Sequence, residues 1–301
     1  MKNFFTIVFG GLAVFFICLS VIRISDYVPR PSPIALHPVL ITASEEEDTD
    51  VIDSAAQALH TSTTTVSAKS YIVRDVLHNK IVLEHDAERL MPIASLTKLV
   101  TAVVSRKLND PNTKITVGPK IMMTYGNTAG FKEGETFTAN DLLYPLLMVS
   151  SNDAAEALAR AYDRKRFIQA MNDFTQSIGA YRTYFSDPAG LSPDNVASAD
   201  DMAHIIEWIS VNDPGIIDIT RLKSKSVRAH TWENPTHFLS WSYYRGGKNG
   251  YLPESDRTSA ALFTLKDGAK GAVEDTYSVV VLGSKTRDAD VVSLLEQAKA
   301  L

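Results

Sequence analysis

The sequence predicts an α+β fold. An antiparallel sheet is built from N- and C-terminal strands and flanked by helices, and a mainly helical subdomain is inserted between those strands. Two observations support this prediction. Segments rich in β-branched and apolar residues occur at 70–75 and 81–85, and again at 258–265 and 276–282. Between them, most apolar residues recur at the three- and four-residue spacing of helices.

The four strands are predicted to form two hairpins, one at each end of the folded region. The first pair flanks His78-Asn79-Lys80, and the second pair flanks the turn sequence Lys266-Asp267-Gly268. After the second hairpin, apolar residues at helical spacing predict a C-terminal helix: Val291, Leu294, Leu295, Ala298 and Leu301.

The middle of the folded region is predicted to be mostly helical. The clearest helix follows Pro92, where apolar residues at i, i+3, i+4 and i+7 form one buried face: Leu96, Leu99, Val100 and Val103. Further helices are predicted at 139–148, 153–162, 167–178 and 200–209. Glycine and proline interrupt this pattern at Asp187-Pro188-Ala189-Gly190 and at Asp213-Pro214-Gly215.

Residues 1–24 are predicted to form a transmembrane signal anchor. The run from Phe4 to Ile22 is almost wholly apolar, and a helix of that length spans about 28 Å, close to the thickness of the bilayer core. A cleaved signal peptide is the alternative, but no small-x-small cleavage site follows the run. The single cysteine, Cys18, lies inside it, so no disulfide framework is expected.

Residues 25–63 are predicted to be a solvated linker that is acidic and rich in Pro, Ser and Thr. No Lys or Arg occurs between Pro31 and Ala68, whereas six carboxylates do: Glu45, Glu46, Glu47, Asp48, Asp50 and Asp53. These six more than account for the net charge of −5. An acidic strip that binds a partner is the alternative, but charged runs usually serve as spacers. Residues 64–301 are then expected to form one folded domain.

Composition and spacing exclude several classes of function. A net charge of −5 argues against nucleic-acid binding, which normally needs a basic face. The seven histidines are scattered, and no pair has the spacing of two metal ligands on one helix. The chain also has neither of the common glycine-rich loops that bind nucleotide phosphates. The sequence therefore predicts neither a metal nor another cofactor.

Ser95 and Lys98 form the one S-x-x-K pattern of the chain, at the start of the helix after Pro92. Residues three apart on a helix project from the same face, so the amine can lie beside the hydroxyl. A serine hydroxyl becomes a good nucleophile when a neighbouring base takes its proton. Lysine can be that base once burial or another cation lowers its pKa. A helix cap followed by an exposed lysine is the alternative interpretation.

Ser150 and Asn152 form an S-x-N pattern just before the alanine-rich helix predicted at 153–162. A hydroxyl and an amide two residues apart at such a junction can both point into one cleft. Helix capping by Asn152 or Asp153 is the alternative. Ser210 and Asn212 have the same spacing, so this pattern alone is weak evidence.

Lys248 and Gly250 form a K-x-G pattern after an aromatic stretch, Trp241 to Tyr244. A glycine-flanked strand lets a ligand approach the backbone closely, and Lys248 can bind a carboxylate or lower the pKa of Lys98. A simple turn is the alternative. Lys266-Asp267-Gly268 also fits K-x-G, but its position between two strands indicates a hairpin turn.

The order of these three patterns is more specific than any one of them. S-x-x-K, then S-x-N, then K-x-G is the signature of penicillin-binding proteins and class A β-lactamases. From about Val66 onward the chain resembles the catalytic domain of serine D-Ala-D-Ala carboxypeptidases, the low-molecular-mass penicillin-binding proteins, which share the β-lactamase/transpeptidase-like fold. A further family landmark is Asp187-Pro188-Ala189-Gly190-Leu191, followed by 199–203.

The resemblance implies a role for each site residue. Ser95 would be the acylated nucleophile, Lys98 its general base and Ser150 a proton shuttle. The remaining residues would bind substrate through a side chain or the backbone: Asn152, Lys248, Asn249, Gly250 and Tyr251. The backbone N–H groups of Ser95 and Tyr251 would form the oxyanion hole. The implied partners are peptidoglycan stem peptides, β-lactam antibiotics as covalent inhibitors, and the membrane through the N-terminal helix.

The resemblance also implies a location and an activity. The protein would be a single-pass protein of the bacterial cell membrane, with its catalytic domain on the extracytoplasmic side. It would act as a D-Ala-D-Ala carboxypeptidase or, with the same apparatus, as a D,D-endopeptidase. A β-lactamase is less expected, because 185–195 contains no Glu to activate water. A degenerate cell-wall-binding module is suggested by Asn249, where the family usually has Thr or Ser. That difference is expected to affect recognition of the substrate carboxylate and turnover more than acylation.

Overall fold

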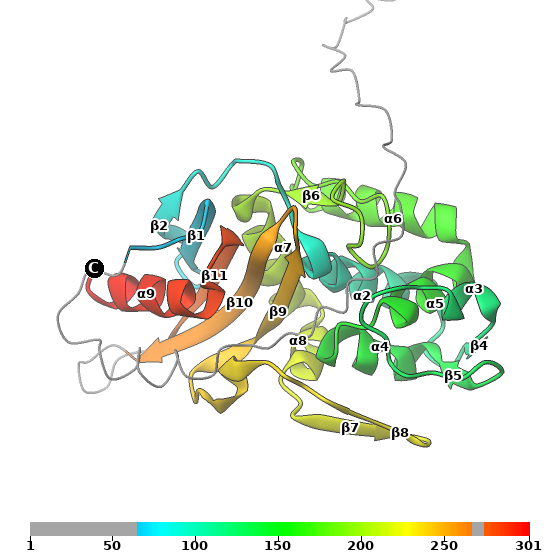
Figure 1. Cartoon of the computed structure of the whole chain (residues 1–301). Helices are drawn as coiled ribbons and strands as arrows, with labels where there is room; N and C mark the ends of the chain where they lie inside the picture. Colours follow the sequence, from blue (N-terminus) through cyan, green and yellow to red (C-terminus); the bar gives the residue numbers. More distant parts are fainter. Residues whose placement is uncertain (1–64, 267–273) are drawn as a thin grey trace, which may run out of the picture. The chain divides into compact units, whose positions relative to one another are not determined.

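The computed structural model describes residues 65–266 and 274–301, which contain a five-stranded antiparallel sheet (Figure 1). The strand order is β2-β1-β11-β10-β9. Their bounds are β1 (Ser70–Asp75), β2 (Lys80–His85), β9 (Tyr244–Leu252), β10 (Asp256–Lys266) and β11 (Glu274–Ser284). β11 lies at the centre and pairs with both β1 and β10. Strands from both ends of the domain thus complete one sheet, which confirms the predicted α+β class.

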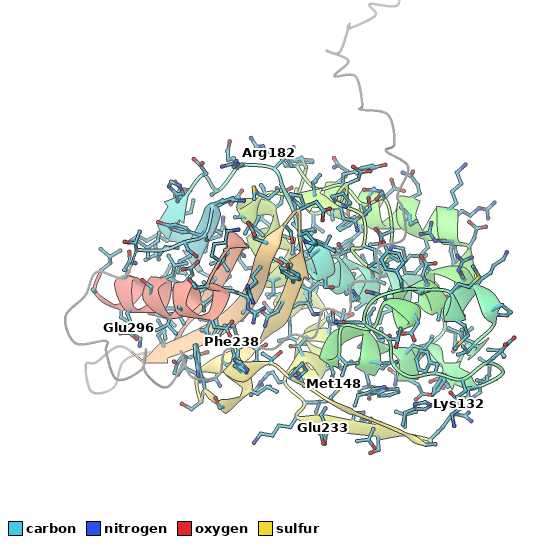
Figure 2. The ribbon with its side chains drawn as sticks, in the orientation of Figure 1. Lys132, Met148, Arg182, Glu233, Phe238 and Glu296 are labelled. Atoms are coloured by element: carbon cyan, nitrogen blue, oxygen red, sulfur yellow. The ribbon has the colours of Figure 1, made fainter. Side chains whose placement is uncertain are left out.

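Helices cover both faces of the sheet, because successive side chains of each strand point to opposite faces. On one face, Val73 and Phe263 pack with Leu294 of α9 (Arg287–Lys299). On the other face, Ile72 and Leu262 belong to a larger core shared with the other helices. Figure 1 shows α9 along one side of the sheet and α2 to α6 gathered together away from it. Charged side chains such as Arg182, Lys132 and Glu296 lie on the periphery (Figure 2).

The inserted part of the chain is mainly helical, as predicted. Its helices are α2 (Thr97–Leu108), α3 (Pro119–Met122), α4 (Ala139–Met148), α5 (Asn152–Tyr162), α6 (Arg164–Ser177), α7 (Ala199–Asn212) and α8 (Pro214–Thr220), with short 3₁₀ turns η1 (Ala94–Leu96) and η2 (His237–Ser240). Hydroxyl caps set several starts: Thr138 caps α4, Ser151 caps α5 and Ser198 caps α7. The sequence therefore predicted the longer helices, and it placed their first and last residues to within a few positions.

Three small two-stranded sheets and two short helices, α3 and α8, were not predicted. The sheets pair β3 (Met91–Pro92) with β6 (Val196–Ala197), β4 (Lys114–Thr116) with β5 (Thr136–Thr138), and β7 (Ser224–Val227) with β8 (His230–Glu233). Strands of two to four residues and helices of four to seven residues carry too little periodicity to be recognised in a sequence. β3 and β6 nevertheless matter for the site, because they lie directly before η1 and before α7.

Helix α2 is more buried than its sequence pattern predicts. The expectation was one buried face, but every residue from Thr97 to Ser105 is buried. α2 packs against α4, α5, α6, α7 and α8, so other elements cover its polar side as well. Lys98 is consequently wholly buried, and so are Thr97 and Thr101. A buried lysine in the first turn of a central helix is the first structural sign of a functional site.

The predicted N-terminal anchor (1–24) and linker (25–63) lie outside the described residues, and so does most of the predicted turn at Lys266-Asp267-Gly268. Within 65–266 and 274–301, no helix combines the length and the hydropathy that a bilayer crossing requires.

Candidate active site

Ser95 and Lys98 lie side by side where η1 passes into α2. The Nζ of Lys98 donates a hydrogen bond of 2.8 Å to the Oγ of Ser95. The three-residue spacing on consecutive helical turns brings the two groups together, as the S-x-x-K pattern predicts. Lys98 has no solvent exposure. The structure therefore places an amine next to a hydroxyl in a setting without bulk water.

Burial lowers the pKa of Lys98 well below its usual range, because the charged amine is removed from water. The positive charge of Lys248 acts in the same direction, whereas the carboxylates of Asp187 and Asp153 act against it. A neutral lysine can accept a proton from the hydroxyl it contacts. The environment thus suits Lys98 to act as a base at a pH where an exposed lysine is still protonated.

The loop from Asp187 to Ser192 positions Lys98 from the other side. The Nζ of Lys98 donates a second hydrogen bond, of 2.6 Å, to the backbone carbonyl of Ala189. The Asp187 carboxylate holds this loop by accepting from four successive backbone N–H groups: Ala189 at 2.7 Å, Gly190 at 2.7 Å, Leu191 at 3.2 Å and Ser192 at 2.8 Å. The sequence marked this segment only as a landmark, and its role in holding Lys98 was missed.

Asn195 joins this loop to the catalytic helix and was also missed by the sequence analysis. Its Nδ2 donates to the Asp187 carbonyl at 2.9 Å and to the Thr97 Oγ1 at 3.1 Å. Its Oδ1 accepts from the backbone and hydroxyl of Ser186, each at 2.9 Å. Asn195 is wholly buried, and burying its amide without hydrogen-bond partners would reduce the stability of the fold. These bonds supply the partners. A lone Asn in a predicted loop gives no signal of this kind in a sequence.

The backbone around Ser95 is tightly packed. Ala94 has a φ of 49°, in the left-handed region that residues with a Cβ rarely adopt. A Cβ added to Gly190 would lie 2.0 Å from the Ala94 carbonyl oxygen, and one added to Gly250 would lie 2.8 Å from the Ser95 nitrogen. The Asp187 loop therefore packs closely against the backbone of Ala94, and strand β9 packs closely against the backbone of Ser95.

Ser150 and Asn152 lie at the start of α5, where a loop before a helix was predicted. Ser150 has a φ of 58°, and within 65–266 and 274–301 its buried Oγ has no hydrogen-bond partner. The Asn152 Nδ2 donates to the Tyr125 carbonyl at 2.9 Å. Asp153 acts on the pKa of Lys98, which brings this segment into the electrostatic surroundings of the lysine. No hydrogen bond in the described structure joins Ser150 to Ser95 or Lys98.

Strand β9 carries the four remaining predicted residues. Lys248 is 7% exposed, and its Nζ donates to the Asn249 carbonyl at 2.7 Å. Gly250 approaches Ser95 as described above, and Tyr251 is 45% exposed, with the Arg257 guanidinium 5.8 Å from its ring centre. Asn249 is partly buried. The structure thus brings β9 to Ser95, and Lys248 acts electrostatically on Lys98.

One group of side chains in the described part of the chain has the spacing of metal ligands: Asp75, His78 and Asp275. It lies at the turn after β1 and the start of β11, not among the predicted site residues. The hydrogen bond between His78 Nδ1 and Asp75 Oδ2, 2.7 Å long, accounts for the closest approach in it. The pair raises the pKa of His78 and lowers that of Asp75, as an ion pair does.

Comparison with known protein families gives one match across most of the chain. The model of the Peptidase_S11 family, D-alanyl-D-alanine carboxypeptidase, matches residues 56–286. A D-alanyl-D-alanine endopeptidase of Haemophilus influenzae is 34% identical over 240 residues, which cover 76% of this chain and 81% of that relative. The D-alanyl-D-alanine carboxypeptidase DacB2 of Mycobacterium tuberculosis is 27% identical over 243 residues, covering 78% and 83%.

Solved structures give the same result. A D-alanyl-D-alanine carboxypeptidase from Mycobacterium tuberculosis superimposes with a TM-score of 0.71 at 25% identity, covering 80% of this chain and 94% of that one. A penicillin-binding protein of Listeria monocytogenes in its cefotaxime-bound form has a TM-score of 0.68 at 22% identity, covering 79% and 99%. The second likeness concerns the fold alone.

Proposed function

Because this chain belongs to the D-alanyl-D-alanine carboxypeptidase family and is therefore a serine hydrolase, we propose that it cleaves D-alanyl-D-alanine-type bonds of peptidoglycan stem peptides through an acyl-enzyme at Ser95. The observation that carries this proposal is the 2.8 Å hydrogen bond between Ser95 and a wholly buried Lys98 whose pKa is lowered. A hydroxyl beside a neutral amine is the arrangement that acylation needs.

The proposed reaction combines this arrangement with the roles that the family pattern implies for Ser150 and Tyr251. Lys98 accepts the Ser95 proton as Oγ attacks the carbonyl of the D-alanyl bond, and the backbone N–H groups of Ser95 and Tyr251 stabilise the oxyanion. The proton passes by way of Ser150 to the leaving amine, so the C–N bond breaks and the acyl group remains on Ser95. Water then attacks the ester carbonyl, Lys98 takes a proton from the water and passes it to the Ser95 Oγ, and the ester C–O bond breaks, which releases the shortened peptide as a carboxylic acid and restores the Ser95 hydroxyl.

Two segments are proposed to bind the substrate: the start of α5 and strand β9. Lys248 and Asn249 would bind the terminal carboxylate, and Asn152 would hold a substrate amide, while Gly250 lets the peptide approach β9 closely. The position of Lys248 gives it two effects, because its charge also helps to keep Lys98 neutral. The assignments of Lys248, Gly250 and Asn152 follow the family pattern, whereas Asn249 stands where the family usually has Thr or Ser.

The arrangement argues against a β-lactamase, which must hydrolyse its acyl-enzyme rapidly. Within 185–195 the buried carboxylate is Asp187, and its oxygens accept from four backbone N–H groups. A carboxylate engaged in this way is poorly placed to activate water. β-Lactam antibiotics are therefore proposed as covalent inhibitors that remain attached to Ser95.

Acylation can be tested with a fluorescent penicillin. We expect stoichiometric labelling of the full chain and none of Ser95→Ala, because the variant lacks the attacking oxygen. Ser105→Ala is the control, since Ser105 is a buried serine of α2, the helix that directly follows η1, and the variant should label normally. Equal labelling of Ser95→Ala and the unaltered chain would contradict the proposal.

A second candidate activity, D,D-endopeptidase, is favoured by the names of the relatives. The curated relatives from Haemophilus influenzae and Escherichia coli, at 34% and 29% identity, are both named D-alanyl-D-alanine endopeptidase. We therefore expect cross-linked muropeptide dimers to be converted to monomers at least as fast as pentapeptide monomers lose D-alanine. Chromatography of both digests with masses of the products measures the ratio. Release of D-alanine from monomers alone would identify a carboxypeptidase instead.

We further propose that residues 1–24 anchor the protein in the bacterial membrane, and that 25–63 link this anchor to an extracytoplasmic domain, 64–301. The apolar run from Phe4 to Ile22 and the six clustered carboxylates support this proposal. The full chain is expected to sediment with membranes after a high-salt wash, and a chain lacking residues 2–24 to remain in the supernatant. Release of the full chain by salt would contradict an anchor, and a mature protein shortened at its N-terminus would indicate a cleaved signal peptide.

A further inference from the structure

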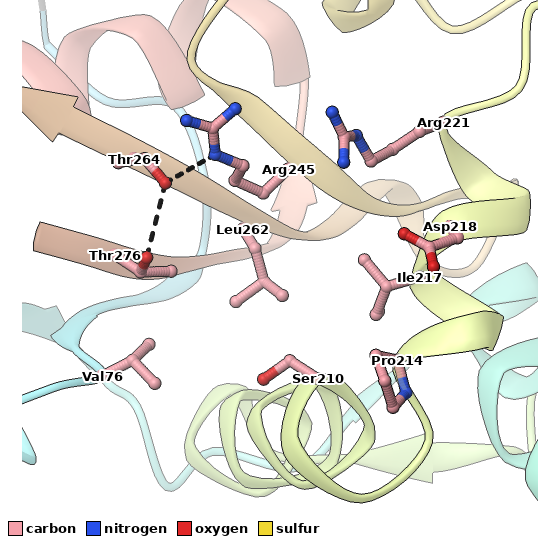
Figure 3. A pocket seen from close by; sticks show the side chains of 10 residues that line it. All are labelled: Val76, Ser210, Pro214, Ile217, Asp218, Arg221, Arg245, Leu262, Thr264 and Thr276. Atoms are coloured by element: carbon pink, nitrogen blue, oxygen red, sulfur yellow. Dashed lines mark hydrogen bonds between the residues drawn. The ribbon is translucent and has the colours of Figure 1, made fainter. Parts of the chain in front are cut away.

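A pocket of about 360 Å³ lies between the sheet and the corner where α7 meets α8, away from Ser95 (Figure 3). Its volume is within the range of pockets that bind small molecules. β9, β10 and β11 form one wall, and the ends of α7 and α8 form the other. None of the proposed catalytic or substrate-binding residues lines it.

Close contacts separate this pocket from the active site. A Cβ on Gly246 would lie 2.5 Å from Ile217, and the Gly247 nitrogen donates to the Thr220 Oγ1 at 3.0 Å. α8 therefore touches β9 between Arg245, which lines the pocket, and Lys248, which belongs to the active site. A ligand in the pocket and a substrate at Ser95 would occupy different spaces.

Two guanidinium groups from different elements stand at this pocket (Figure 3). Arg245 is the extra residue where the pairing of β9 with β10 shifts register, and its Nε donates to the Thr264 Oγ1 at 2.7 Å, which fixes the side chain. Arg221 directly follows the last residue of α8, and its side chain is exposed. No carboxylate of the described residues forms an ion pair with it. Paired guanidinium groups favour a carboxylate or phosphate.

Asp218 distinguishes between these anions. It lines the same pocket, one helical turn before Arg221, and no described cation pairs with it. A carboxylate at this position repels a doubly charged phosphate but attracts an ammonium group. A ligand that carries both a carboxylate and an ammonium group complements the charges of Arg221, Arg245 and Asp218.

Apolar side chains also line the pocket. Leu262 is 2% exposed and Ile217 is 6% exposed, and Val76 lies beside them among the lining residues. A ligand with an apolar side chain gains free energy by covering these groups, about 25 cal/mol for each Å² removed from water. The charged and apolar side chains of the lining together therefore favour a small amphipathic zwitterion.

We propose that this pocket binds a free α-amino acid or short peptide with an apolar side chain. Its carboxylate lies between Arg221 and Arg245, its ammonium group at Asp218, and its side chain against Leu262 and Ile217. The site is distinct from the Ser95 centre and does not depend on acyl transfer.

Calorimetric titration of the full chain carrying Ser95→Ala tests this site without any acyl chemistry. Its result therefore does not depend on whether the proposed function is correct. The probe is leucine, and the comparison ligand is 4-methylpentanoate, which lacks only the ammonium group. We expect saturable binding of leucine and binding of 4-methylpentanoate that is about tenfold weaker. The unaltered chain, once labelled at Ser95 with benzylpenicillin, is expected to bind leucine equally well.

Three variants assign the contacts. Arg221→Gln and Arg245→Gln are each expected to weaken leucine binding about tenfold, because each removes a charge-assisted hydrogen bond. Asp218→Asn should abolish the preference for leucine over 4-methylpentanoate. Lys223→Gln, an exposed cation outside the pocket lining, should bind normally. Unchanged unfolding temperatures would show that the variants are folded.

Several outcomes would overturn the proposal. One is the absence of saturable binding of leucine. Another is binding that both arginine variants retain, and a third is binding that penicillin labelling removes, which would place leucine at Ser95. Saturable binding of inorganic phosphate without binding of leucine would identify an anion site in place of a zwitterion site.

Discussion

Replacing Lys98 with methionine is expected to slow acylation of Ser95 by a factor of about 10² to 10⁴, the usual contribution of general-base catalysis. Methionine matches the length of the apolar part of lysine but cannot accept the Ser95 proton. The second-order rate constant for labelling with fluorescent penicillin measures the loss. Lys107→Met, which changes an exposed lysine of the same helix, should leave that rate unchanged.

The same base predicts the pH dependence of acylation. Lys98 acts only when neutral, and burial together with Lys248 lowers its pKa well below the usual range of lysine. The acylation rate should therefore rise with pH and reach its plateau well before pH 10. Lys248→Met removes one cause of the lowered pKa and should move the rising limb to higher pH. A limb that stays in place would show that Lys248 does not act on Lys98.

Lys98→Met also has an expected effect on stability. The folded-state pKa of Lys98 is lower than that of the unfolded chain, about 10.4, so between these values the unfolded chain binds one more proton. That difference destabilises the native state at neutral pH and makes stability increase as pH rises. The variant should unfold at a higher urea concentration at pH 7 and lose this part of the pH dependence. A variant that is less stable than the unaltered protein at pH 7 would contradict this account of the buried amine.

Gly190→Ala is expected to destabilise the protein by about 3 kcal/mol or more and to impair acylation at the same time. Gly190 has a φ of 80°, which alone costs an alanine about 1 to 2 kcal/mol. Its Cβ would also lie 2.0 Å from the Ala94 carbonyl oxygen, so the backbone next to Ser95 must move. Urea unfolding and the acylation rate constant measure the two effects.

Gly130→Ala is the matched control for this prediction. Gly130 has a similar φ of 72°, but a Cβ there would meet no atom within 4 Å. It should therefore show the conformational cost alone, with acylation unchanged. Equal losses of stability in the two variants would show that contact with Ala94 contributes nothing.

The sequence predicted the elements that carry strong periodicity. The α4 range was predicted to the residue, and the four strands of the two terminal hairpins were found in one sheet. The small sheets were missed because two to four residues hold no period. The full burial of α2 was missed because Thr97, Lys98 and Thr101 are polar, and a polar face normally indicates solvent.

For the site, the S-x-x-K motif predicted that Ser95 and Lys98 lie side by side, because a short motif encodes local geometry well. Ser95 and Lys98 meet through helical spacing, and Gly250 reaches Ser95 through the close approach that glycine permits. The contacts made by Asp187 and Asn195 are of another kind. They depend on how a loop folds back on α2, a long-range arrangement that no local spacing encodes.

The pairing of β1 with β11 determines when the sheet can form during folding. Val73 pairs with Val279, so the contacts at the centre of the sheet join residues near the two ends of the domain and close a loop of almost its whole length. Such a loop is entropically costly, and topologies dominated by distant pairings fold slowly. A nascent chain that ends before β11 has the β1–β2 hairpin and the helices but no central strand to join them. The native sheet of the domain can therefore form only after β11 has been synthesised.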